Sequence, residues 1–205
     1  MTPIVMPPQP APEFMENTGF RQFSVDEYHQ MIRTGILAHG EPVELLEGWM
    51  VKKMSHGTPH DSVIDTIEGE LLRLLPTDWF PRSQRAVTLT DSEPEPDIAV
   101  VRGPRGRYKT NHPIPGDIAV LIEVSDSSLR TDRIGKARIY ARAGIPVYWV
   151  VNVVDKIIEV YTLPSGTDAT AAYAKRDDYP VGTTAPVVLD GNLLGNIAIA
   201  DVFGS

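Results

Sequence analysis

The stretch IAVLIEVS, residues 118 to 125, decides the fold that we expect for this chain. Its first five residues are all apolar, and a similar run, DIAVVRG, spans residues 97 to 103. Near-continuous apolar runs of this length are typical of central strands that are covered on both faces. The two stretches therefore predict two strands at the centre of one sheet.

The longest helix is expected at residues 58 to 76, TPHDSVIDTIEGELLRLLP. Thr58 is a residue type that caps helix N-termini, and Pro76 is expected to end the helix. A spacing of three and four residues predicts one apolar face, formed by Val63, Ile64, Ile67, Leu71 and Leu74. His60 shares this side, so it is expected to point inward at the start of the helix.

Two shorter helices are expected on either side of these elements. The first has a capping box formed by Ser24 and Glu27, and Gly35 marks its end. The second is expected at residues 132 to 143, with Thr131 as its cap.

Strand signals fill much of the remaining chain. Residues 43 to 52 predict a hairpin of two short strands, and RAVTLT, residues 85 to 90, predicts a further strand. VYWVVN, residues 147 to 152, and KIIEVYTL, residues 156 to 163, predict a strand pair. Weaker strands follow and end in NIAIADVF, residues 196 to 203.

This order of helices and strands around one sheet predicts a single α/β (α+β) domain at residues 19 to 205, with a mixed central sheet flanked by helices. Residues 1 to 18 are different, because five prolines fall within the first twelve positions. Such a composition predicts a flexible N-terminal arm.

The composition narrows the class of protein. The 205 residues carry no cysteine, which excludes disulfides and thiolate metal sites. No apolar run approaches the roughly 20 residues that span a bilayer, and no signal peptide is recognisable, so a cytoplasmic protein without a membrane partner is expected. The net charge of −8 argues against nonspecific binding to nucleic acid, yet residues 102 to 142 are locally basic.

Three residues with the chemistry of a metal site stand near the ends of predicted elements. Asp97 opens one central strand, Glu123 nearly closes the next, and Lys136 lies on the helix that follows. If the two strands are neighbours, the carboxylates meet at one end of the sheet, where a divalent cation relieves their repulsion. Magnesium favours one or two carboxylates with water, and a lysine beside it stabilises charge that develops on a phosphate.

This constellation resembles the PD-(D/E)XK nuclease superfamily. PD is residues 96 and 97, and EVS, residues 123 to 125, has serine where lysine is usual. The stretch EVSDSSLRTDRIGKARIYARAGIPVYWVV, with VELLEGWMVKKMS before it and LLGNIAIADVF after it, resembles the Uma family of bacterial restriction-type endonucleases. The resemblance covers residues 20 to 203 and implies a restriction-endonuclease-like core with extra N-terminal and C-terminal strands.

The resemblance also implies catalytic and metal-binding roles. Asp97 and Glu123 become metal ligands, together with the backbone carbonyl of Val124. Lys136 becomes the catalytic lysine that Ser125 replaces in the usual position. The implied cofactor is Mg²⁺ or Mn²⁺.

Other residues receive supporting roles from the resemblance. Glu44 contacts the metal or its ligands, His60 lines the same pocket, and Asp132, on one helix face with Lys136 and Tyr140, holds the lysine in place. Candidate contacts to phosphate are Gln84, Arg105 and Arg107.

Structural alternatives stay open for several of these residues. Asp97 after a proline is also typical of a turn that is closed by an Asx hydrogen bond. Asp132 and Lys136 are also spaced as an ordinary exposed helix pair, worth only about 0.3–0.5 kcal/mol. For His60, a buried histidine whose hydrogen bonds are satisfied is the more common explanation.

The function that these residues favour is a divalent-metal-dependent endonuclease that hydrolyses DNA, with a homodimer expected by analogy. The alternative is a binding or regulatory protein that keeps the nuclease fold with little catalysis, which the acidic net charge and the displaced lysine favour. A metal-free glycosidase with two carboxylates has little support, because aromatic residues are only 7% of the chain.

Overall fold

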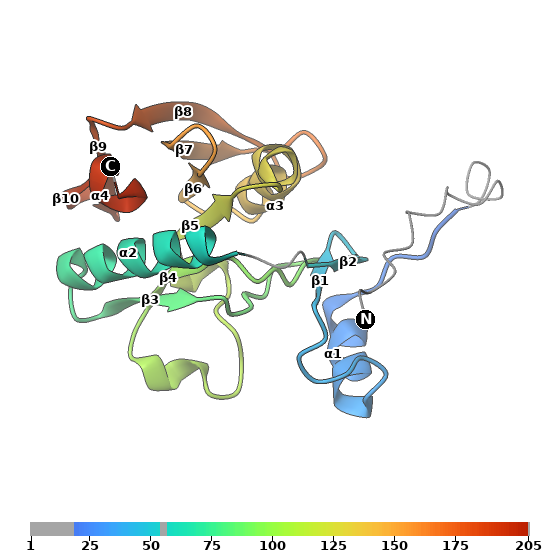
Figure 1. Cartoon of the computed structure of the whole chain (residues 1–205). Coiled ribbons are helices and arrows are strands. Elements are labelled where there is room, and N and C mark those ends of the chain that lie inside the picture. The colour runs from blue at the N-terminus through green and yellow to red at the C-terminus, as the bar shows by residue number, and fades with distance from the viewer. Residues whose placement is uncertain (1–18, 54–56, 205) are drawn as a thin grey trace, which may run out of the picture.

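The computed structural model describes residues 19–53 and 57–204, so the arm expected at residues 1–18 lies outside the described residues. At its centre is a six-stranded sheet in the order β3-β4-β5-β6-β7-β8 (Figure 1). The β5–β6 pair is parallel and the other neighbouring pairs are antiparallel. The strands are β3 Trp79–Ser83, β4 Ile98–Arg102, β5 Ile118–Ser125, β6 Val147–Asn152, β7 Ile157–Ser165 and β8 Ala172–Pro180. The predicted mixed central sheet is confirmed.

The apolar stretch IAVLIEVS forms β5, one of the two middle strands of this sheet, and all eight of its residues are buried. The predicted neighbour, β4, pairs with it antiparallel. A parallel pair needs a crossover connection, and helical segments supply it between β5 and β6. They are a π-helical segment, Thr131–Lys136, and α3, Ala137–Arg142.

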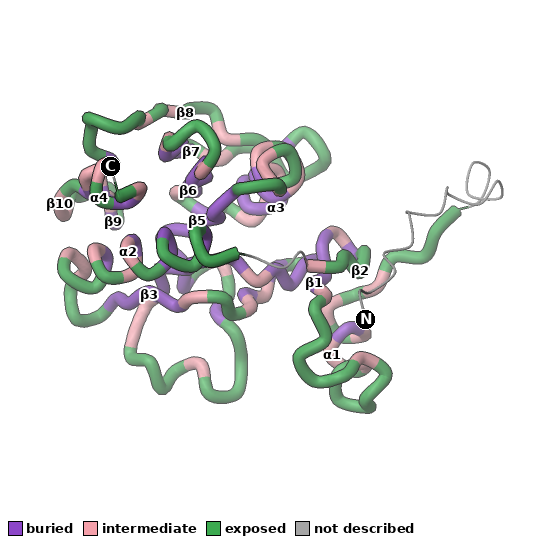
Figure 2. The backbone as a smooth tube through the Cα atoms, viewed as in Figure 1, coloured by how far each residue is buried: buried purple, intermediate pink, exposed green. Residues whose placement is uncertain are grey.

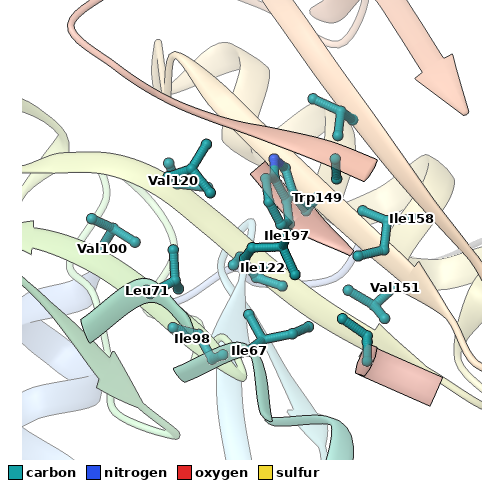
Figure 3. Packing of buried hydrophobic residues seen from close by; sticks show 14 of the residues in the cluster. Ile67, Leu71, Ile98, Val100, Val120, Ile122, Trp149, Val151, Ile158 and Ile197 are labelled. Carbon is teal, nitrogen blue, oxygen red and sulfur yellow. The ribbon is translucent and has the colours of Figure 1, made fainter. Parts of the chain in front are cut away.

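One face of the sheet is covered by a helix and by the C-terminal elements (Figure 1). These are α2 Thr58–Leu74, β9 Thr184–Leu189, β10 Asn192–Ala198 and α4 Ile199–Phe203. Ile67 and Leu71 of α2 pack in one cluster with Ile122 and Trp149 of the sheet (Figure 3). The predicted inward face of α2 is therefore confirmed, although Leu74 at its end is only partly buried.

The opposite face of the sheet is covered by α3. Tyr140 of α3 and Tyr148 of β6 are both fully buried there, with ring centroids 5.0 Å apart in an edge-to-face contact. Figure 2 shows the consequence, since buried residues concentrate in the central strands and in the helix faces turned toward them.

The N-terminal elements lie at one end of the molecule, away from β9, β10 and α4 (Figure 1). They are α1 Val25–Thr34, β1 Val43–Leu46 and β2 Trp49–Lys52. The predicted capping box between Ser24 and Glu27 is present, and β1 and β2 form the predicted hairpin. No helix within the described residues is long and apolar enough to cross a membrane.

Two predictions on the N-terminal side of the sheet are wrong. Thr58 does not cap α2, because the helix already includes it and Gly57 takes the cap position without a side-chain hydrogen bond. RAVTLT is not a strand either. The edge strand is β3, which precedes it, and Gln84 ends β3 by adopting a left-handed backbone with φ of 51°.

Two further predictions shift on the C-terminal side. Thr131 does not cap the crossover helix, because helical backbone already begins at residue 129. Of NIAIADVF, only the first three residues belong to a strand, β10, and the remainder is the short helix α4. The crossover helix thus begins earlier than predicted, and the last strand ends earlier than predicted.

Candidate active site

The two carboxylates predicted to meet do lie at the same end of the sheet. Ile98 pairs with Ile122 in the antiparallel β4–β5 ladder, which places Asp97 beside Glu123. Both residues are buried and both line a cavity of about 310 Å³. Asp97 Oδ2 also accepts a hydrogen bond of 2.7 Å from the backbone N–H of Val124, so its carboxylate is fixed to the neighbouring strand.

The lysine reaches the same cavity from the crossover segment. Lys136 Nζ lies 3.0 Å from Glu123 Oε1 and 3.7 Å from Glu44 Oε1. Its side chain is only about one-tenth exposed. Helical segments of the π type are rare and are often found at functional sites. This one ends at the residue that points toward the carboxylates.

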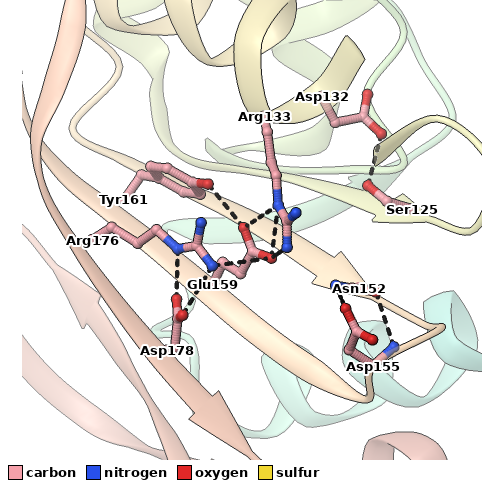
Figure 4. Close-up of polar contacts among 9 residues, drawn as sticks. All are labelled: Ser125, Asp132, Arg133, Asn152, Asp155, Glu159, Tyr161, Arg176 and Asp178. Carbon is pink, nitrogen blue, oxygen red and sulfur yellow. Dashed lines mark hydrogen bonds and ion pairs between the residues drawn. The ribbon is translucent and has the colours of Figure 1, made fainter. Parts of the chain in front are cut away.

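Asp132 holds the start of the crossover segment. Its Oδ2 accepts hydrogen bonds from Ser125 Oγ at 2.7 Å, drawn in Figure 4, and from Ser128 Oγ at 2.5 Å. The expected clamp of Asp132 on Lys136 is not what the structure has, because the ion pairs of Lys136 among the described residues are with glutamates. Hydrogen bonds in a π-helical turn run from i to i+5, so residues four apart do not stack as in an α-helix.

Tyr140 contacts Glu123 directly, and Glu44 contacts Lys136, which pairs with Glu123. Tyr140 OH donates a hydrogen bond of 2.6 Å to Glu123 Oε1. Glu44, on β1, accepts one of 3.1 Å at Oε2 from the backbone N–H of Glu95, while its Oε1 faces Lys136. The hairpin and α3 thus both contribute to the arrangement around Glu123.

His60 lies in the first turn of α2 and lines the cavity as predicted. Its Nε2 is 3.2 Å from Asp97 Oδ2. Burial alone lowers the pKa of His60, but the hydrogen bonds and charges of Asp97 and Asp61 together outweigh burial and raise it above its usual value. His60 therefore supports Asp97 from the helix side, as Val124 supports it from the strand side.

The family model described as "Putative restriction endonuclease", named Uma2, matches residues 25–189. This chain belongs to the Uma2 family. The membership confirms the resemblance found in the motifs.

A solved structure agrees with the fold of this Uma2 chain. It is the crystal structure of a "putative nuclease belonging to DUF820" from Anabaena variabilis, with a TM-score of 0.63 at 16% identity. The match covers 89% of this chain and 98% of the other. No curated protein matches the sequence.

The pKa values of the ionisable groups in the cavity of this Uma2 protein are shifted by burial and by one another. Burial raises the pKa of Glu123 well above its usual value, and the nearby ammonium of Lys136 offsets this only in part. Burial alone lowers the pKa of Lys136, but the charges of Glu123, Glu44 and Asp132 together outweigh burial and raise it. Glu44 and Glu123 therefore share the ammonium of Lys136, while Asp97 is held by His60 and by the N–H of Val124.

The donor set suits a hard cation. Among residues 19–53 and 57–204, no three His, Cys, Asp or Glu side chains are grouped as metal ligands. Asp97 and Glu123 line one cavity, and a pair of carboxylates completed by water and a backbone carbonyl is the kind of site that Mg²⁺ uses. A zinc site would require more nitrogen or sulfur ligands.

Sequence reasoning missed Lys53 and Glu95, which line the cavity and form an ion pair. The signal was present, because Lys53 follows the hairpin that carries Glu44 and Glu95 stands two residues before Asp97.

The structure does not bring the three predicted phosphate contacts into the cavity. Arg105 and Arg107 follow the far end of β4, where Arg107 pairs with Asp117 at 2.6 Å. Gln84 donates its backbone N–H to the carbonyl of Asp97 at 3.0 Å, but its side chain lines a different cavity.

Proposed function

We propose that this protein is a divalent-metal-dependent endonuclease that hydrolyses phosphodiester bonds of DNA. The observation that carries the proposal is the meeting of Asp97, Glu123 and Lys136 in one cavity. Membership of the Uma2 family supports a nuclease, and the solved structure supports the fold alone.

Asp97 and Glu123 would hold a Mg²⁺ or Mn²⁺ ion together with the carbonyl of Val124. Such an ion, when bound, lowers the pKa of a water ligand and neutralises charge on the phosphate. The protein keeps both carboxylates in place before the ion binds, because Val124 N–H and His60 fix Asp97 and Tyr140 fixes Glu123.

Lys136 would contact the phosphate that is cleaved and stabilise the negative charge that grows on it. Glu44 and Glu123 keep its side chain in the cavity and keep it protonated. Ser125, at the usual lysine position, is occupied by its hydrogen bond to Asp132. The lysine on the crossover segment thus takes the place of a lysine on β5.

The test is cleavage of supercoiled plasmid DNA with Mg²⁺ or Mn²⁺. Asp97→Asn and Lys136→Met should each lower the cleavage rate by about 10²–10³-fold, because each removes a charge from the reacting centre. The matched control is Asp178→Asn, an exposed acid on β8, which should cleave like the wild type. Cleavage that both site variants retain would contradict the proposal.

Calorimetry with Mn²⁺ separates the enzyme from a binding protein with the same fold. The enzyme binds Mn²⁺, and Asp97→Asn removes that binding, because the ion loses one of its two carboxylates. DNA binding without any cleavage or Mn²⁺ binding would instead favour the regulatory alternative.

A further inference from the structure

A second cavity, of about 420 Å³, lies next to the candidate active site. It is bordered by the connection between α1 and β1 and by the end of β3, and Arg82, Gln84, Arg85 and His112 are among its lining residues. Glu95 lines both cavities. The short segment that leads to Asp97 therefore separates the two spaces.

Arg82 is the unusual residue of this second cavity. It is 9% exposed, and its Nη1 is buried without a hydrogen-bond partner among residues 19–53 and 57–204. Its guanidinium lies 5.1 Å from the ring centre of Tyr108, and within the described chain it forms no ion pair. A buried cation without an anion is costly unless a ligand supplies the missing charge.

The carboxylates that line this cavity already have other partners. Glu93 is hydrogen-bonded to His29 Nε2 at 2.7 and 2.8 Å, Glu95 pairs with Lys53, and Glu41 accepts the N–H of Ala38. Arg82 and Arg85 are therefore the charged side chains of this cavity that have no carboxylate partner among the described residues.

The pKa shifts reflect cations that are buried close to one another. Burial lowers the pKa of Arg82, and the nearby charge of Arg85 lowers it further. Burial also lowers the pKa of His112, and Arg82 contributes in the same direction against Glu93. These three side chains thus act on one another across the second cavity.

We propose that the second cavity binds a backbone phosphate of the DNA strand beside the phosphate that is cleaved, through Arg82 with Arg85. The planar guanidinium fork matches a phosphate, and the adjacent cavity places this contact next to the proposed reacting centre. The inference rests on the proposed function, because it takes DNA as the substrate.

The test is fluorescence anisotropy of a labelled 20-base-pair duplex in EDTA, where no divalent ion supports cleavage. Arg82→Met should weaken binding about tenfold and reduce the slope of log affinity against log salt by about one. The matched control, Arg73→Met, removes the same charge from an exposed residue near the end of α2 and should bind like the wild type. Equal binding by wild type and Arg82→Met would overturn the inference.

Thermal melting distinguishes a ligand role from a structural one. If Arg82 serves a ligand, Arg82→Met melts at or above the wild-type temperature, because a buried uncompensated charge has been removed. A lower melting temperature with normal DNA binding would show a structural arginine and overturn the inference. If Arg82→Met fails to fold, the variants Arg82→Lys and Arg85→Met are measured in its place. Unchanged DNA binding by both of these variants would overturn the inference.

Further outcomes separate this inference from the proposed DNA hydrolysis and from binding of a free anion. Binding that depends on Arg82, in a protein that never cleaves DNA, upholds the phosphate contact and contradicts the proposed hydrolysis. Cleavage of DNA by a protein whose DNA binding does not depend on Arg82 would support the proposed hydrolysis and contradict the phosphate contact. Stabilisation by inorganic phosphate that depends on Arg82, while DNA binding does not, would assign the cavity to a free anion and overturn the DNA contact.

Discussion

Two buried glutamates, Glu123 on β5 and Glu159 on β7, have similar partners and opposite surroundings. Each accepts a hydrogen bond from a tyrosine, Tyr140 at 2.6 Å and Tyr161 at 2.8 Å. Each also faces a cation from the segment Thr131–Lys136. The difference lies in how completely the carboxylate is occupied.

Glu159 is fully buried and surrounded by donors (Figure 4). Arg133 Nε donates to both of its oxygens at 3.0 Å, a second nitrogen of Arg133 adds another bond, and Arg176 lies at 3.4 Å. An arginine fork occupies both oxygens of a carboxylate at once. This site is complete within the protein.

Glu123 is held on one side only. Among the described residues, its hydrogen bonds and ion pair all reach Oε1. The residue also lines the 310 Å³ cavity, and its partner is a lysine, which acts as a point charge instead of a fork. Glu123, which has free hydrogen-bonding capacity beside a cavity, is therefore suited to bind a ligand. Glu159, whose two oxygens are both occupied by protein groups, is suited to stabilise the fold.

The largest expected effect follows from removing the charge of the incomplete site. Glu123→Gln keeps the shape of the side chain and should lower the rate of DNA cleavage by about 10³-fold or more, because the ion loses a ligand. The melting temperature of the metal-free protein should stay within a few degrees of the wild type, because a costly buried charge is removed and Lys136 keeps Glu44 as a partner. A plasmid cleavage assay and calorimetric melting measure the two effects.

The opposite result would contradict the proposed difference between Glu123 and Glu159. A Glu123→Gln protein that cleaves DNA normally and melts far below the wild type would make Glu123 a framework residue.

The second prediction applies the same substitution to the complete site. Glu159→Gln leaves Arg133 and Arg176 without their shared carboxylate and should lower the free energy of unfolding by about 2 kcal/mol. For a chain of this size the melting temperature falls by about 6 °C. Binding of Mn²⁺, measured by calorimetry below the melting transition, should persist, because neither proposed metal ligand contacts Glu159.

A double variant supplies the control for this second prediction. Glu159→Leu with Arg133→Leu replaces the ion pair by apolar groups and should recover stability relative to Glu159→Leu alone. Absence of any recovery would mean that the pair does not act as a unit.

Much of this arrangement follows from the sequence. The apolar runs of β4 and β5 predict central strands, and if those strands are neighbours, Asp97 and Glu123 can meet at one end of the sheet. The register that pairs Ile98 with Ile122 then places the two carboxylates side by side. Lys136 is also predictable, because the family resemblance implies a catalytic lysine on the helical segment that follows β5.

The remainder depends on geometry that no local pattern records. RAVTLT has the composition of a strand, but the left-handed backbone at Gln84 ends the β3–β4 ladder before residue 85, where RAVTLT begins. The spacing of Asp132 and Lys136 predicts a helix pair, but the π-helical turn turns Asp132 toward Ser125. Arg82 and Glu159 look like ordinary strand residues until long-range packing buries one alone and surrounds the other with arginines.

The smallest expected effect tests whether the framework glutamate positions the lysine of the active site. Arg133 and Lys136 lie in one π-helical segment, so loosening the grip of Arg133 on Glu159 should displace Lys136. Arg133→Lys keeps the charge and loses the fork, and it should lower kcat by about tenfold with little change in KM. Mn²⁺ binding should stay at the wild-type level.

Arg176→Lys is the matched control, because it also changes an arginine beside Glu159 but lies on β8, outside the crossover segment. It should leave kcat unchanged. An equal fall in kcat for both variants would mean that Glu159 affects activity only through overall stability. A fall in kcat confined to Arg133→Lys would show that the ion pair of Arg133 with Glu159 holds the π-helical segment in place. That segment carries Lys136, the partner of Glu123.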